Sequence, residues 1–404
     1  MTKFFGLSSI GGLVLTVETM KTSAITNTKI ILEDGIIWDG TVLFEGDKIA
    51  AFGKSHETPI PVSAKVYDAR GLYTAPGFVD VHNHGGNGYW FYNEPEHAAE
   101  YFLKHGQTTV LPAVYFNLDY EQTITAMNTI RNASKSGAAR IIKGLYMEGP
   151  YMNPKYGSDN KNIKWKKKIA SDEFTEIVDT AGDFVKVWCI APEREGIEDF
   201  LSYARQVNPT VVFSLGHCDA DTEMIHKLKR YGIKNQTHHT DSGQPQAMLP
   251  GLKSAGADEY CLYDEDLYAE LICDYVGVHV RPFYLRMAVK IKGVDKIILI
   301  TDSTAFTGEF KEGGPVAVCG PDLVYDEVGW LAGCKLTMDA ACRNMMMHTG
   351  YGLCHVIKFA TANPAKMAGL YDELGSINVG KKANLIIIDD MVNIKKVIFE
   401  GEEV

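Results

Sequence analysis

Several features are scarce or missing in this 404-residue sequence, and each absence argues against a class of protein or of partner. The eight cysteines are scattered with no Cys-x-x-Cys pair, which favours reduced, buried thiols and a cytoplasmic protein. No uninterrupted apolar run reaches the roughly 20 residues that span a bilayer, so we expect no membrane partner. Lys and Arg number 40 against 51 Asp and Glu, and the net charge of -11 argues against a nucleic-acid partner.

The first residues are predicted to form an extension, residues 1–24, outside the folded domains. Phe4 to Val17 is moderately apolar and follows Lys3, which faintly resembles a signal peptide. The single charge and the Ser and Gly content of this stretch favour a plain extension instead.

Both ends of the chain read as short strands separated by tight turns. Asp34-Gly and Asp39-Gly supply hairpin chemistry near the N-terminus, and the same texture returns from Gly375 onward. We therefore predict one small β-sandwich domain built from residues 25–73 and 375–404. It brackets a central domain of residues 74–374.

The central domain alternates strand-like runs with helical stretches, which predicts the α/β class. The eight runs are Phe78–Val81, Thr108–Val114, Ile141–Glu148, Val185–Ile190, Val211–His217, Ile233–His238, Ala269–Cys273 running on to His279, and Lys296–Asp302. Eight is the count of a (β/α)8 TIM-type barrel. A doubly wound open sheet would alternate similarly, but no Gly-x-Gly-x-x-Gly follows the first run, which disfavours dinucleotide binding.

Metal-capable residues end several of these runs, and parallel barrel strands all end on one face. His82 and His84 are two residues apart on one strand, so their side chains project together. Glu148, His217 and His238 end later runs. Imidazole and carboxylate ligands suit zinc or a similar transition metal. Five ligands exceed one tetrahedral site, so we expect one ion or two that share Glu148.

Asp302 ends the last run and is the predicted proton carrier. Hydrolysis of an amide requires a group that takes a proton from water and delivers it to the leaving nitrogen. A carboxylate beside the metal but outside its strongest coordination can do both. His279 is a further polar residue expected near this face.

Seven segments carry a family resemblance. They are residues 76–86 (PGFVDVHNHGG), 147–154 (MEGPYMNP), 191–193 (APE), 214–220 (SLGHCDA), 301–305 (TDSTA), 361–365 (TANPA) and 375–384 (GSINVGKKAN). Together they resemble the N-acetylglucosamine-6-phosphate deacetylases of the amidohydrolase superfamily, from about residue 27 to the end.

The resemblance implies a metal-bearing barrel, a β-sandwich from both termini and a homodimer with the active site near the subunit interface. By position, Glu148, His217 and His238 match the principal metal ligands, and Asp302 matches the general acid/base. His82 and His84 match a second metal site that only some members keep. The metal expected is zinc, with iron as the alternative. The last of the implied site residues is His279, which matches a substrate-binding histidine.

The substrate half of the resemblance is altered. After Thr237-His, the family carries a hydrophobic residue, a Phe or Tyr and Asn-Ala-Met, whereas this chain continues with His-Thr-Asp-Ser-Gly-Gln. No Arg occurs between Arg230 and Arg281, where the family has a phosphate-binding one. A histidine expected shortly after the Glu-Gly-Pro loop is replaced by Gly157-Ser-Asp-Asn. We take His239, Asp241 and Arg281 as further candidate substrate contacts.

The leading hypothesis is a metal-dependent deacetylase of a small-molecule N-acetylated amino sugar with an altered phosphate pocket. One alternative is an amidohydrolase acting on another amide, such as an N-acyl-D-amino acid or a cyclic amide. A second alternative is a non-catalytic metal-binding relative, which is disfavoured because such proteins tend to lose ligands or the acid/base.

Overall fold

The computed structural model describes residues 21–157, 161–241, 243, 245, 251–306, 320–325 and 331–404. Most of the predicted extension, residues 1–20, lies outside the described residues, as do Cys319 and parts of the departures noted at Gly157 and Asp241. In the part that is described, none of the helices combines the length and the apolar character needed to cross a bilayer.

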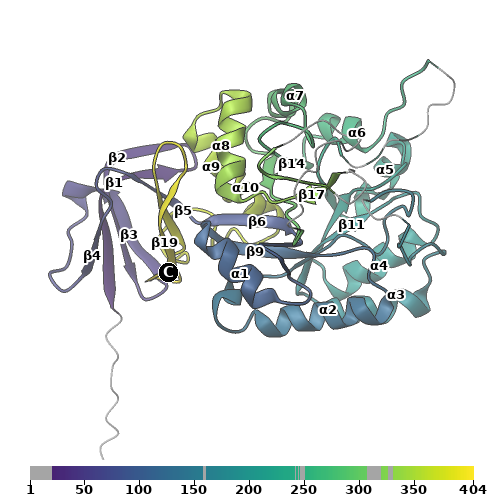
Figure 1. Ribbon diagram of the computed structural model, residues 1–404, viewed down its shortest axis with the longest axis horizontal. Helices are drawn as coiled ribbons and strands as arrows, with labels where there is room; N and C mark the ends of the chain where they lie inside the picture. The colour runs from purple at the N-terminus through teal and green to yellow at the C-terminus, as the bar shows by residue number, and fades with distance from the viewer. Residues whose placement is uncertain are drawn as a thin grey trace, which may run out of the picture.

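The two ends of the chain share one sheet, as predicted (Figure 1). Its strand order is β20-β19-β18-β5-β1-β2-β3, and β4 pairs with β1. The strands are β1 (Thr22–Leu32), β2 (Gly35–Glu45), β3 (Lys48–Lys54), β4 (Lys65–Asp68), β5 (Tyr73–Pro76), β18 (Leu385–Ile388), β19 (Ile394–Phe399) and β20 (Glu402–Glu403). Buried Ile25, Ile30, Phe44, Leu385 and Ile398 form part of a separate core for this sheet. The sheet reaches Pro76, past residue 73, where the sequence placed its edge.

The barrel is an eight-stranded parallel sheet in the order β15-β14-β13-β12-β11-β10-β9-β6. Its strands are β6 (Phe78–Asn83), β9 (Gln107–Val114), β10 (Leu145–Met147), β11 (Val185–Ile190), β12 (Val212–Leu215), β13 (Ile233–Gln236), β14 (Tyr268–Ile272) and β15 (Ile297–Ile300). The backbone N–H of Asp302 donates to the carbonyl oxygen of His82 at 3.0 Å and joins the last strand to the first. The predicted α/β barrel is therefore confirmed.

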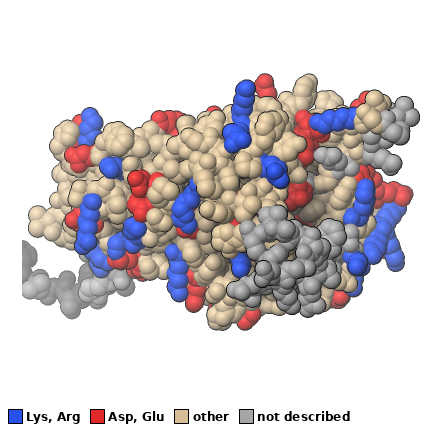
Figure 2. Space-filling model, turned by 45° about the horizontal axis from the view of Figure 1, so that its top comes forward, with Lys and Arg blue, Asp and Glu red and all other residues tan. Residues whose placement is uncertain are grey.

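Helices surround this barrel on its outer side (Figure 1). They are α1 (Pro95–Lys104), α2 (Tyr120–Ala133), α3 (Ser171–Ala181), α4 (Ile197–Val207), α5 (Thr222–Leu228), α6 (Ala257–Tyr263), α7 (Pro282–Lys292), α8 (Met338–Thr349), α9 (Leu353–Phe359) and α10 (Ala362–Met367). Short strand pairs, β7 (Gly85–Gly86) with β8 (Tyr89–Trp90) and β16 (Leu323–Tyr325) with β17 (Leu331–Cys334), lie beyond the barrel strands. On the face drawn in Figure 2, the visible Lys and Arg side chains are interspersed with Asp and Glu.

Two predicted strands were wrong in their extent. The third run was predicted from Ile141 to Glu148, but β10 covers only Leu145–Met147, and Ile141 ends a short 3-10 helix. The seventh run was expected to continue to His279, but β14 ends at Ile272. Buried Asp274 accepts backbone N–H groups from Val276, Gly277, Val278 and His279 at 2.6–3.1 Å. These bonds fold the segment into a loop around the carboxylate, so the ladder cannot continue.

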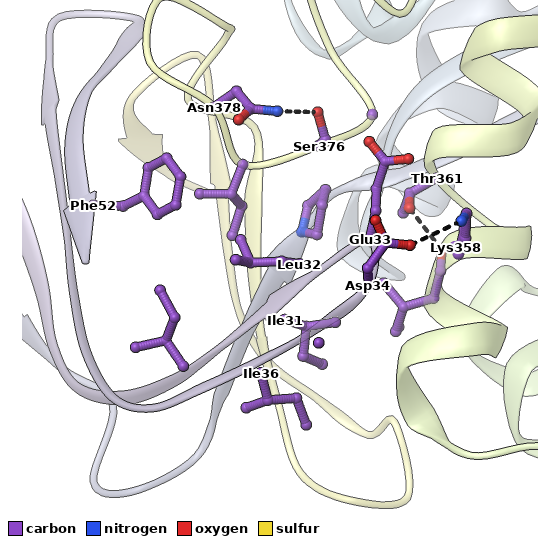
Figure 3. Close-up of a pocket in the computed structure, with 16 residues that line it drawn as sticks. Ile31, Leu32, Glu33, Asp34, Ile36, Phe52, Lys358, Thr361, Ser376 and Asn378 are labelled. Atoms are coloured by element: carbon purple, nitrogen blue, oxygen red, sulfur yellow. Dashed lines mark hydrogen bonds and ion pairs between the residues drawn. The ribbon is translucent and has the colours of Figure 1, made fainter. Parts of the chain in front are cut away.

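The small sheet and the barrel meet at a cavity of about 500 Å³ (Figure 3). Apolar Ile31, Ile36 and Phe52 of the sheet line it together with residues of α9. Lys358 of α9 is only 6% exposed, and its Nζ lies 3.3 Å from Asp34 and 2.6 Å from Asp295. The buried Lys358 thereby ties the β1–β2 turn to the barrel, although the two carboxylates that it pairs with are exposed.

The seam of the barrel generates a stability prediction centred on buried Asp80 of β6. Its Oδ2 accepts hydrogen bonds from Thr301 Oγ1 at 2.6 Å, Asn83 Nδ2 at 2.9 Å and Gln107 Nε2 at 2.9 Å. Asp80→Ala should lower the free energy of unfolding by about 3–5 kcal/mol, because it leaves buried donors without an acceptor. Urea denaturation measures this. Exposed Asp183→Ala is the control and should stay within about 0.5 kcal/mol of wild type. A loss below about 1 kcal/mol for Asp80→Ala would contradict this account of the seam.

Candidate active site and metal centre

The carboxylate of Glu148 lies at the centre of four imidazoles. It follows β10, and its Oε1 is 2.9 Å from His217 Nε2 and 3.1 Å from His238 Nε2. Its other oxygen, Oε2, is 3.0 Å from His84 Nε2, and His82 Nε2 lies 3.6 Å from Oε1. The structure thus brings together all five residues that the strand ends suggested.

These residues fit a metal ion on the evidence of their own geometry. His217 Nε2 and His238 Nε2 are 3.1 Å apart, and both face Glu148. Buried His82 Nε2 makes no hydrogen bond. The ligand atoms form two groups, each within 4.8 Å: Glu148, His217 and His238, and His82, His84 and Glu148. Nitrogen and carboxylate donors at such closeness suit a divalent transition metal, and Glu148 belongs to both groups.

The electrostatics of the cluster also favour a cation. Burial lowers the pKa of His238, but the hydrogen bond with Glu148 and the charge of Asp302 outweigh it and raise that pKa to about 9. Burial likewise opposes the charge of Glu148, yet His82 and His84 hold its pKa well below its usual range. The carboxylates therefore create a negative potential inside a dry site, where a bound positive charge is stabilised.

The strand ends are conformationally unusual at three site residues. His217, His238 and Asp302 have φ values of 48°, 26° and 46°, in the left-handed region. Such a backbone is uncommon for non-glycine residues and costs on the order of 1–3 kcal/mol where it persists. Each residue lies two positions after the last residue of its barrel strand, and the left-handed backbone there directs its side chain over the end of the barrel.

Asp302 lies beside the metal cluster without joining either ligand group. Its Oδ1 is 3.3 Å from His84 Nε2 and 3.6 Å from His82 Nε2. Burial opposes its charge, but His82 and His84 lower its pKa, so the carboxylate is ionised at neutral pH. Its side chain is 18% exposed and lines the cavity, where it can meet a substrate.

Sequence reasoning missed a layer of residues beneath the cluster. Glu270 of β14 is fully buried; its Oε2 is 3.4 Å from His82 Nδ1 and accepts the His238 backbone N–H at 3.3 Å. Tyr146 stacks on His82 with ring centroids 4.4 Å apart. A carboxylate behind a metal-ligand histidine fixes its tautomer and orientation. The sequence signal for Glu270 is a single acidic residue inside the apolar run Ala269-Glu-Leu-Ile, where a buried carboxylate needs a partner.

A cavity of about 530 Å³ opens onto the cluster. Of the candidate substrate contacts, His279 and Asp241 line it, together with Tyr115, Tyr156 and Thr304. Burial opposes protonation of His279, but an ion pair with Asp274 at 3.3 Å raises its pKa.

Two candidate substrate contacts lie elsewhere. His239 is completely buried, and its Nδ1 is 2.6 Å from Gln236 Oε1. The turn after β13 points this ring away from the cavity, so its expected substrate contact is corrected to a structural one. Arg281 is exposed at the N-cap of α7, outside the cavity lining that the structure describes.

A (β/α)8 barrel with histidines and a carboxylate gathered at the carboxyl ends of its strands defines a class, the metal-dependent hydrolases. The family model described as the Amidohydrolase family matches residues 73–404. The chain belongs to this family and is a hydrolytic enzyme.

Relatives of known activity extend along nearly the whole chain. An N-acetylgalactosamine-6-phosphate deacetylase from Escherichia coli O157:H7 is 28% identical over 395 residues, covering 93% of this chain and 97% of its own. An N-acetylglucosamine-6-phosphate deacetylase from Bacillus subtilis is 26% identical over 391 residues, covering 93% and 96%. The crystal structure of N-acetylglucosamine-6-phosphate deacetylase from Pasteurella multocida superposes with a TM-score of 0.82 at 25% identity, over 95% of this chain and 99% of that one.

The two ligand groups predict different roles in metal retention. His238→Ala should abolish tight binding, because it removes a nitrogen from the group with Glu148 and His217. His82→Ala should lower the stoichiometry at most from two ions to one. Elemental analysis after dialysis measures both variants beside wild type. If His82→Ala instead strips the protein of all metal, the order of the two sites is inverted.

Proposed function

We propose that this protein removes the acetyl group from an N-acetylated amino sugar in a metal-dependent reaction. The placement of Asp302 carries the proposal: an ionised carboxylate 3.3 Å from His84 borders both the ligand cluster and the cavity. The deacetylase relatives support an acetamide as the bond that is cleaved. They favour an acetamide over the N-acyl-D-amino acid and the cyclic amide that the sequence left as alternatives.

Zinc is the proposed metal, as one ion or as two; Glu148 belongs to both candidate ligand groups and would serve either arrangement. Glu148, His217 and His238 would hold the tighter site, and His82 and His84 the second. A divalent ion held by these residues would supply Lewis acidity for the acetamide carbonyl and for a nearby water. Glu270 keeps His82 oriented, and the barrel ends fix the remaining ligands.

The protein side chains supply proton transfer and orientation. Asp302 accepts the proton of the attacking water and then donates it to the leaving nitrogen, so one carboxyl group serves as base and acid. His279, whose pKa is raised by its pair with Asp274, can donate a hydrogen bond to the sugar from the cavity wall. Tyr115 and Tyr156 line the cavity and can exclude water around the acetyl group.

A cytoplasmic homodimer is proposed as the working form. Seven described cysteines are free thiols, which suits a reducing compartment. Phe283 and Tyr284 at the start of α7 are 65% and 43% exposed, with rings 5.8 Å apart, and offer apolar surface for a second subunit.

Acetate release tests the proposal directly. Zinc-loaded protein is incubated with N-acetylglucosamine, N-acetylgalactosamine and their 6-phosphates, and free acetate is quantified. Release from at least one sugar that stops on chelation and returns with zinc is the expected result. Failure on all four sugars, with zinc bound, would refute the proposal.

The acid/base role predicts a selective defect. Asp302→Asn should lower kcat by roughly 10² to 10⁴ because the amide keeps the shape but cannot accept the proton. Metal content should stay near wild type, since Asp302 belongs to neither ligand group. Turnover and elemental analysis of the same preparation check both expectations, and unchanged turnover would remove Asp302 from the mechanism.

A further inference from the structure

The turn that follows β13 carries two strained residues and ends in an acid. His238 has a φ of 26° and Thr240 a φ of 74°. A β-branched residue such as threonine rarely adopts a positive φ. The backbone N–H of Asp241 donates to the carbonyl oxygen of His238 at 2.9 Å and closes the turn. Strain of this kind persists only where the surroundings enforce it, and it concentrates at functional sites.

Two carboxylates, those of buried Glu270 and half-buried Asp258, enforce this conformation. Glu270 accepts the backbone N–H of His238 at 3.3 Å, and Asp258 accepts that of Thr240 at 3.2 Å. Asp258 also accepts a hydrogen bond from Gln236 Nε2 at 2.5 Å. The turn is therefore braced on both sides, and its shape has two consequences. The conformation of the turn places His238 beside Glu148, and it places Asp241, which is exposed, in the wall of the cavity.

Asp241 belongs to neither ligand group; burial raises the pKa of its carboxyl, and the nearby His238, His279 and His217 oppose that shift. Glu148 and Asp302 each lie within 3.6 Å of histidine nitrogens and belong to the ligand cluster or border it. His279, which shares the wall with Asp241, is already paired with Asp274. A carboxylate presented to a substrate accepts strong hydrogen bonds from hydroxyl groups and repels an anion placed against it.

We infer that Asp241 is a specificity-determining residue that selects an unphosphorylated N-acetyl hexosamine. Its carboxylate accepts a hydrogen bond from a sugar hydroxyl, and the same charge disfavours a phosphate ester. The inference rests on the proposed deacetylase function and names its substrate class. It separates this chain from the relatives whose names specify 6-phosphate sugars.

The test compares charge-selective variants on matched substrates. We would measure kcat/KM for acetate release from N-acetylglucosamine, N-acetylgalactosamine and their 6-phosphates, using zinc-loaded wild type, Asp241→Asn and Asp241→Ser. Asp266→Asn removes an equal charge from a side chain that is 78% exposed, before β14, and serves as the control. Circular dichroism and metal content verify that each variant is folded and loaded.

Wild type should favour a neutral sugar over its 6-phosphate by at least about tenfold. Asp241→Asn should lose about 10- to 100-fold on the neutral sugar, the value of a hydrogen bond to a charged group, and move the neutral-to-phosphate ratio toward the phosphate by about tenfold or more. Asp241→Ser should move that ratio in the same direction, and Asp266→Asn should leave it unchanged.

Two results would overturn the inference while leaving the deacetylase function intact. One is a wild-type kcat/KM for a 6-phosphate at or above about 10⁵ M⁻¹s⁻¹ that exceeds the value for the neutral sugar. The other is a ratio that stays within about twofold of wild type in both Asp241 variants. The wild-type comparison decides even if neither variant folds. Absence of acetate from all four sugars would instead remove the proposed function and this inference with it.

Discussion

The interaction on which the site depends is that of one buried carboxylate, Glu148, with four imidazoles. The Nε2 atoms of His217 and His238 are 3.1 Å apart in a buried site. Two imidazole lone pairs this close would repel each other unless a cation or a proton lay between them. Glu148 compensates part of that cost and also spans both ligand groups. Its position follows from β10, so the barrel framework decides the spacing of the whole cluster.

The barrel seam and the site are one construction. Asp80 ties β6 to Thr301 beyond β15, and the next bond along the chain joins His82 to Asp302. Any slip between the first and last strands would therefore displace Asp302 from His82 and His84. This explains why buried polar groups, which are costly unless satisfied, are concentrated where the barrel closes. Stability and geometry of the site are supplied by the same hydrogen bonds.

Strand ends could be found from the sequence, whereas turn directions could not. Period-two spacing placed His82 and His84 together, and parallel strands placed Glu148, His217, His238 and Asp302 on one face. The sequence could not show that His239 points into the protein while Asp241 reaches the cavity, because that depends on the left-handed backbone of His238 and Thr240. Asp274 likewise ended β14 through bonds to four following N–H groups, a local effect that an apolar run does not reveal. Glu270 was visible only as an acid within a buried strand.

Chemistry and substrate choice reside in different parts of this fold. The candidate metal ligands lie at strand ends, where packing on both sides restricts substitution. Asp241 lies on the turn that places His238 beside Glu148, and its side chain lines the cavity. A substitution at Asp241 can therefore alter the charge offered to a substrate without moving a ligand atom. Barrel enzymes commonly vary their loops over a constant framework. Asp258 and Glu270 hydrogen-bond to the backbone of this turn and fix its conformation. That one conformation places His238 among the candidate metal ligands and Asp241 on the substrate side.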